Sequence, residues 1–183
     1  RQHRNIEVFR PCRGSFIFEL LRSVYHNKLG ISENIRAASR IINSCFRNSG
    51  TLFVCGNGGS YADAEHIVGE LSKGFLKKRP VSYETGEKMN ETAGEDVSDI
   101  FSNLQCGFKA MTLAHNSALS TAFANDVDPE LCYAQQIFIM GSKGDVLIGI
   151  STSGNAGNIL AAFRTARAVG VKTVLLTGCK HGK

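Results

Sequence analysis

Residues 51–60 read TLFVCGNGGS, an apolar run from Thr51 to Cys55 that meets a turn with three glycines. The same order of apolar run and polar turn recurs three times: AMTLA (110–114) before HNSALS, VLIGI (146–150) before STSGN, and TVLL (173–176) before TGCKHGK. Continuous apolar runs of this length indicate strands that are buried on both faces of a sheet. Because the runs alternate with stretches of helical character, the sequence predicts an α/β fold with a central parallel sheet.

Length and composition set the class of protein. The chain has 183 residues, 43% of them apolar and 20% charged, which suits one domain with a substantial core. No run reaches 18 consecutive apolar residues, so the sequence predicts no membrane-spanning helix. The formal net charge of +5 is only mildly basic; it does not indicate a nucleic-acid partner and suits a small anionic ligand equally well.

The six cysteines are expected to be reduced. None is spaced as CxxC and their neighbours are mostly apolar, which is typical of thiols that fill core space. A disulfide framework does not fit a chain of this length with its own core. Reduced thiols predict a cytoplasmic protein.

The two ends of the chain differ from its middle. Residues 1–13 carry four arginines against Glu7, which indicates a basic amino-terminal arm, with a transit peptide as the alternative. Residues 14–50 predict amino-terminal helices, a first one from Phe16 to Leu29 that ends at Gly30 and a second one capped by Ser32. Residues 51–183 form the main domain. A further helix would normally follow its fourth strand, so we expect its carboxyl-terminal end to be incomplete.

Residues 77–106 interrupt the alternation of strands and helices. This stretch is polar, acidic in its second half and too long for a simple connection. We interpret it as an insertion with a short helix near Val97 to Leu104. It is expected either to form a lid over the ligand-binding edge of the sheet or to be a solvated surface excursion.

The turn after the first strand, Gly56-Asn57-Gly58-Gly59-Ser60, suits an anion. Its glycines permit positive φ angles and close approach of a ligand, and Ser60 is a candidate cap for the next helix. Free amides at a helix start favour negative charge. The turn matches neither the dinucleotide-binding nor the Walker pattern, and a simple tight turn is the alternative.

A second polar turn follows the third strand. Ser151, Thr152 and Ser153 offer three consecutive hydroxyl donors, followed by Gly154 and Asn155 and then by a predicted helix. Helix capping alone would explain one such turn. Because the carboxyl ends of parallel strands share one edge, the two turns together predict a single anion site there.

Two further pairs carry possible chemistry. His66 and Glu70 are four residues apart on one helix, so both side chains lie on the same face and can bind a metal or move protons. An exposed helix face is the alternative. Asn125-Asp126 is typical of a turn or cap, or it binds sugar hydroxyls.

The chain resembles the sugar isomerase (SIS) domain, and within it the phosphoheptose isomerase group, in three stretches of the same order: GNGGSYADAEHIVGE, SALSTAFANDVDPELCYAQQ and GDVLIGISTSGNAGNILAAFRTARAVGVKTVLLTG. The resemblance implies a three-layer αβα sandwich, a homotetramer built through the amino-terminal helices, and binding of a phosphorylated sugar. It places substrate contacts on both turns and on Asp126, as follows: phosphate on Ser60, Ser151, Thr152 and Ser153; sugar on Asn57 and Asp126; and the adjoining loop positions Gly58, Gly59 and Asn155.

The same resemblance implies a mechanism. Glu70 would be the base of an enediol proton transfer between ketose and aldose, with His66 beside it as a catalytic partner. His66 and Glu70 would also supply half of a zinc site, whose other two ligands lie on a later helix that this sequence does not contain. Ala156 stands where the family often has a hydroxyl. The alternative function is a non-catalytic SIS module that senses a sugar phosphate or scaffolds a protein partner.

Overall fold

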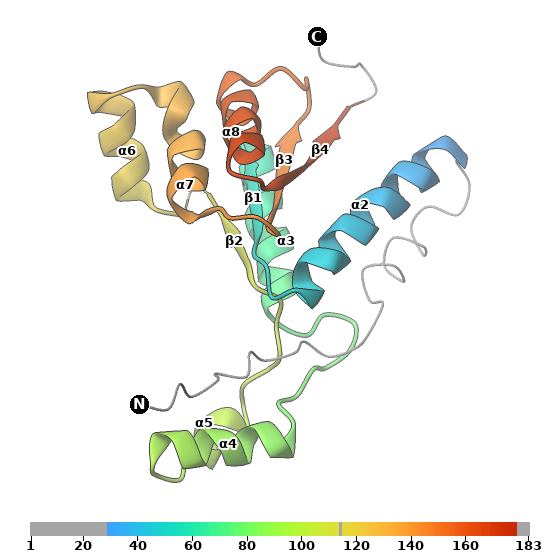
Figure 1. The fold of residues 1–183 in the computed structure, drawn as a ribbon, viewed down its shortest axis with the longest axis vertical. Helices are drawn as coiled ribbons and strands as arrows, with labels where there is room; N and C mark the ends of the chain where they lie inside the picture. The colour runs from blue at the N-terminus through green and yellow to red at the C-terminus, as the bar shows by residue number, and fades with distance from the viewer. Residues whose placement is uncertain (1–28, 114, 179–183) are drawn as a thin grey trace.

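The computed structural model describes residues 29–113 and 115–178 of the chain (Figure 1). Four strands form one parallel sheet in the order β2-β1-β3-β4, with bounds β1 Leu52–Gly56, β2 Ala110–Thr112, β3 Val146–Ser151 and β4 Lys172–Thr177. All four apolar runs therefore form the predicted strands. The amino-terminal arm, the first predicted helix up to residue 28 and the last five residues lie outside the described part of the chain.

Helices cover both faces of the sheet, which confirms the three-layer αβα sandwich. Leu52 and Val54 point to the face covered by α2 (Leu29–Arg47) and α3 (Gly59–Ser72). Phe53 and Cys55 point to the opposite face, where α7 (Cys132–Met140) and α8 (Gly157–Ala168) pack. This alternation follows from the two-residue repeat of a strand, and burial on both faces explains why the runs are uninterrupted.

The amino-terminal helix differs from its prediction. Helix α2 already includes Gly30 and Ser32, so Gly30 does not end a helix there and Ser32 does not occupy the N-cap position. The cost of one glycine inside a helix, about 1 kcal/mol, is offset by the apolar face that α2 buries through Ile42, Cys45 and Phe46.

The stretch 77–106 contains two helices, α4 (Tyr83–Ala93) and α5 (Ser98–Phe101). The second confirms the helix predicted near Val97; the first was not predicted. Together they lie beyond the amino-terminal ends of the strands (Figure 1), so the prediction of a lid over the carboxyl-terminal edge is wrong. The reason is connectivity: α3 runs from the carboxyl-terminal edge back to the amino-terminal edge, and the chain re-enters the sheet at the start of β2.

The thiols behave as expected where they are described. Cys45, Cys55 and Cys132 are buried and unpaired, and Cys106 is half-buried. Burial raises the pKa of Cys45 to about 11 and that of Cys55 to about 12, so both remain protonated core residues. In residues 29–113 and 115–178, no helix is long and apolar enough to cross a membrane.

One buried carboxylate joins α7, β1 and β3 at the amino-terminal edge. Asp145 accepts hydrogen bonds from the backbone N–H of Thr51 (2.7 Å) and from the N–H and hydroxyl of Ser142 (2.9 and 3.1 Å). The next residue, Val146, is the first of β3 and pairs with Lys172 of β4, so the hydrogen-bonded pairing of these two strands begins here.

Replacing Asp145 with Ala should lower the free energy of unfolding by about 2–4 kcal/mol, because the buried N–H of Thr51 and the half-buried N–H of Ser142 lose a charged acceptor. Urea denaturation followed by circular dichroism measures the change. The exposed Asp63→Ala is the matched control and should stay within about 0.5 kcal/mol of the parent. Equal stabilities of the two variants would contradict the role given to Asp145.

Candidate functional site

The two predicted turns lie side by side. Strands β1 and β3 pair in parallel, with Gly56 opposite Ile150, so the turns that follow them leave the same edge from neighbouring positions. Strand β2 lies on the other side of β1, and the crossover through α6 (Ser117–Asp126), η1 (Pro129–Leu131) and α7 then places β3 on the opposite side. The gap between β1 and β3 is therefore the point where strand order reverses, which is where open α/β sheets bind ligands.

The glycine turn is set by a close approach. A Cβ on Gly56 would lie 2.4 Å from the carbonyl oxygen of Ser60, so no larger residue fits without moving the turn. Gly58 has a φ of 55° and is the N-cap of α3, which begins at Gly59. The prediction that Ser60 caps this helix is therefore wrong: the left-handed turn at Gly58 starts the helix earlier, and Ser60 lies in its first turn.

Side chains from three elements join the turns. Asn57 and Asn158, at the start of α8, exchange two hydrogen bonds between their amides, both 2.9 Å. Tyr133 of α7 donates to the carbonyl of Gly56 (2.5 Å) and lies 3.3 Å from the amide oxygen of Asn57. Burial raises the pKa of Tyr133 to about 12, so it stays a neutral donor. Asn158 and Tyr133 were not predicted, because their contacts join residues about 76 to 101 positions apart.

The hydroxyl turn is preorganised by its own backbone. The buried Ser151 hydroxyl accepts from the N–H of Gly154 (3.1 Å), and the exposed Ser153 hydroxyl accepts from the N–H of Asn155 (3.2 Å). Each hydroxyl accepts a hydrogen bond and so keeps its own proton for a ligand. The N-cap of α8 is Ala156, which provides no side-chain cap, and the first-turn amides of this helix suit an anion.

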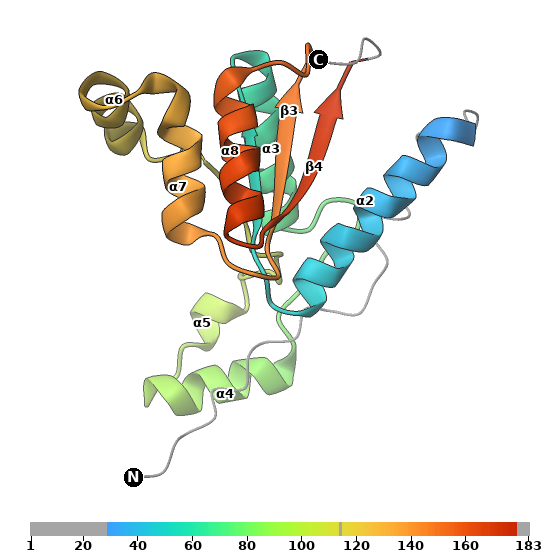
Figure 2. The ribbon, with the colours of Figure 1, turned by 45° about the horizontal axis from the view of Figure 1, so that its top comes forward.

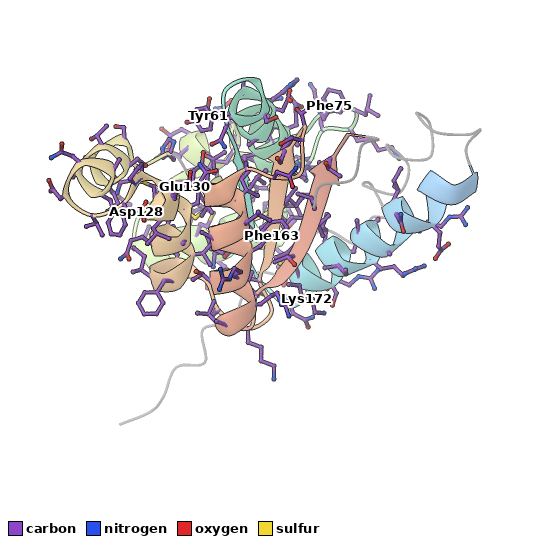
Figure 3. The ribbon with its side chains drawn as sticks, turned by 90° about the horizontal axis from the view of Figure 1, so that it is seen from above. Tyr61, Phe75, Asp128, Glu130, Phe163 and Lys172 are labelled. Carbon is purple, nitrogen blue, oxygen red and sulfur yellow. The ribbon has the colours of Figure 1, made fainter. Side chains whose placement is uncertain are left out.

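A carboxylate already lies at this helix start. Glu130 of η1 packs so closely on Gly157 that a Cβ there would be 1.7 Å from its Oε2 atom. Figure 3 labels Glu130 beside α8. A negative side chain at the first turn of α8 is favoured by the helix dipole. An anionic ligand at this turn and the Glu130 carboxylate would both interact with the dipole of α8. No sequence signal pointed to Glu130, because the contact depends on how η1 meets α8.

His66 and Glu70 lie on one face of α3, as their spacing predicted. His66 Nε2 is 3.8 Å from Glu70 Oε1, and Lys73 Nζ lies 3.1 and 3.2 Å from the two Glu70 oxygens. With 1.5 Å of rise per residue, His66 lies about 10 Å and Glu70 about 16 Å along the helix from Gly59.

The pair supplies two donors of the types that zinc takes. Within the described residues, no group of three or more His, Cys, Asp or Glu side chains is placed to hold a metal. In this part of the chain, the pair thus offers at most two of the four ligands that a tetrahedral zinc site needs.

Asp126 is the last residue of α6 and is exposed, and it accepts a hydrogen bond from Asn125 (2.8 Å). Asn125-Asp126 ends a helix, as one of its two interpretations expected. Binding of a sugar by Asp126 stays a prediction.

These features define a class: a three-layer α/β protein with a glycine-rich turn and a hydroxyl-rich turn side by side at the strand-order reversal. The SIS domain model matches residues 17–100 and 97–178. The chain belongs to the SIS domain family.

Among curated proteins, the chain is 34% identical over 149 residues to the phosphoheptose isomerase of Desulfovibrio desulfuricans and 35% identical over 149 residues to that of Vibrio cholerae. Each match covers 81% of this chain, and the chain spans 59% and 64% of the length of these relatives. Two solved structures are similar. The phosphoheptose isomerase of Neisseria gonorrhoeae has a TM-score of 0.60 and 26% identity over 88% of this chain and 70% of that one. The enzyme of Francisella tularensis has a TM-score of 0.64 and 25% identity over 90% and 77%.

Replacing Gly56 with Ala should destabilise the fold by about 1–3 kcal/mol, because the new Cβ meets the backbone of Ser60. Gly59→Ala is the matched control: no heavy atom lies within 4 Å of its Cβ position, and alanine favours a helix. Thermal denaturation compares the two. A Gly56→Ala protein as stable as Gly59→Ala would show that the turn is not held as described.

Proposed function

We propose that this protein binds the phosphate of a phosphorylated sugar between the β1–α3 and β3–α8 turns and interconverts its ketose and aldose forms. The observation that carries the proposal is the amide pair of Asn57 and Asn158, which holds the two turns next to each other. The names of the similar curated proteins, phosphoheptose isomerases, support a heptose phosphate such as sedoheptulose 7-phosphate as the substrate.

The turns would hold the phosphate through hydroxyl and backbone donors. Ser60, Thr152 and Ser153 present hydroxyls at the edge of the sheet, and Ser151 supports them from its buried position. Gly58, Gly59 and Asn155 complete the loop backbone around the anion, while Asn57 and Asp126 contact the sugar. Binding energy from a phosphate remote from the reacting carbons orients the sugar for reaction.

Glu70 would act as the base, with His66 beside it. Isomerisation removes a proton from the carbon next to the carbonyl and returns it to the neighbouring carbon, so one carboxylate can serve both steps. The backbones of His66 and Glu70 lie about 10–16 Å along α3 from Gly59, and their side chains lean back toward the helix start, so a sugar with several carbons between phosphate and carbonyl is needed to approach them. Lys73 Nζ, 3.1 and 3.2 Å from the two Glu70 oxygens, occupies part of the hydrogen-bonding capacity of this carboxylate.

The proposal also includes a zinc ion and an oligomeric state. His66 and Glu70 would contribute two ligands to zinc, which as a Lewis acid polarises the sugar oxygen. We further propose a cytoplasmic homotetramer built through the amino-terminal helices.

A non-catalytic function is the second candidate. The observation that favours it is the ion pair between Glu70 and Lys73, because Lys73 occupies the carboxylate that would have to take the proton. In that case the protein would bind a sugar phosphate as a sensor or a scaffold and would not convert it.

Replacing Ser153 with Ala should weaken binding of sedoheptulose 7-phosphate by about 1–3 kcal/mol, because a phosphate oxygen loses a donor. Isothermal titration calorimetry measures the change in affinity. The control is Ser102→Ala, at the exposed residue that follows α5. Unchanged affinity in the Ser153 variant would show that the phosphate binds elsewhere.

Replacing Glu70 with Gln separates the two functions. An isomerase should lose turnover by about 10²–10⁴-fold while its affinity for the sugar phosphate changes little. Glu65→Gln is the matched control on the same helix, since the Glu65 carboxylate is occupied by the Tyr61 hydroxyl at 2.7 Å. Turnover is followed by the appearance of the aldose, with and without zinc. Absence of turnover in the unaltered protein under both conditions would favour the sensor.

A further inference from the structure

Residues 82–104, which we call the arm, bury almost nothing against their own chain. Helices α4 and α5 meet where Gly86 packs on the Phe101 ring, and Gly86 is the one buried residue of these two helices. Large apolar side chains face solvent instead: Tyr83 is 80% exposed, Ile100 55% and Leu104 46%. Short helices owe their stability to packing of an apolar face. The exposed apolar side chains of the arm therefore indicate that another surface covers them.

Residues 73–81 and 105–109, which we call the neck, join the arm to α3 and β2. Arg79 donates to the carbonyls of Leu71 (3.1 Å) and Lys73 at the end of α3, and its guanidinium lies 4.7 Å from the centre of the Phe108 ring. Phe108 in turn stacks on Phe46 of α2 at 4.6 Å. Gly74 donates to the side chain of Gln105 (2.8 Å), which ties the two passes of the neck together. The neck therefore fixes the arm beyond the amino-terminal edge of the sheet (Figure 2).

The charge of the arm indicates which surface of the protein could cover it. The arm has six acidic residues against Lys88, a net charge of −5, whereas the rest of residues 29–113 and 115–178 has 12 Lys and Arg against 8 Asp and Glu, a net charge of +4. Basic residues gather at the amino-terminal edge, where the strands begin and α2 and α8 end: Arg47, Lys109, Lys143, Arg167 and Lys172. The carboxylate at this edge, Asp145, is buried and engaged by Thr51 and Ser142.

We propose that the arm docks on the amino-terminal edge of a second copy of this chain. The acidic arm and the basic edge lie on the same side of the molecule, so a two-fold axis brings each arm against the partner's edge reciprocally. Tyr83, Ile100 and Leu104 would be covered in the contact, and the opposite charges would set its register. This contact is independent of the proposed function and uses a different surface from the amino-terminal helices.

Charge exchange between two variants tests the contact. The first carries Glu84→Lys, Glu87→Lys and Glu91→Lys on the arm; the second carries Lys109→Glu, Lys143→Glu and Lys172→Glu on the edge. Every altered side chain is exposed. In the first variant both surfaces are basic, and in the second both are acidic, so each should associate with itself about tenfold more weakly than the parent. An equimolar mixture should recover association, because each arm then meets an edge of opposite charge.

Sedimentation equilibrium of the full chain at about 50 and 500 mM salt measures the association, which should weaken at the higher concentration. Circular dichroism checks that each variant is folded. A third variant, Tyr83→Ser with Ile100→Ser, keeps all charges and should also associate about tenfold more weakly. Self-association that is unaltered in the charge variants, or a mixture that fails to recover, would overturn the proposal, as would a parent chain that stays monomeric at both salt concentrations.

Discussion

The in-register parallel pairing of β1 and β3 is the constraint on which the site depends. It sets Gly56 opposite Ile150, so that the glycine turn and the hydroxyl turn begin at the same height. The Asn57–Asn158 amide pair and the Tyr133 hydroxyl then close the remaining distance. The pairing itself rests on the two apolar layers, because side chains alternating along β1 and β3 pack against helices on both faces. Function at the edge is thus a property of the core beneath it.

Helix direction divides the molecule into two ends with different tasks. Helices α3 and α8 begin at the carboxyl-terminal edge, where their amides favour an anion, and finish at the opposite edge. His66 and Glu70 lie part of the way along α3, so the site is elongated along this helix. Basic side chains and the arm collect at the far end. The proposed ligand site and the proposed contact between two copies therefore lie at opposite ends of one sheet.

Local patterns in the sequence predicted the strands, because burial on both faces leaves an unmistakable apolar run. The adjacency of the two turns also followed from sequence, through the handedness of crossovers. The contacts of Glu130, Asn158 and Tyr133 did not, since each depends on how a helix from a distant part of the chain settles on the sheet. Ser60 was misplaced because Gly58, with its positive φ, takes the N-cap position two residues earlier. The side occupied by the arm was open to prediction: an insertion after a helix and before a parallel strand must leave from the amino-terminal edge.

That point of insertion separates two kinds of evolutionary change. Residues can be inserted or deleted between α3 and β2 without changing the ligand edge at the other end of the sheet. Homologues that differ only between α3 and β2 would keep the same ligand edge but could form different oligomers.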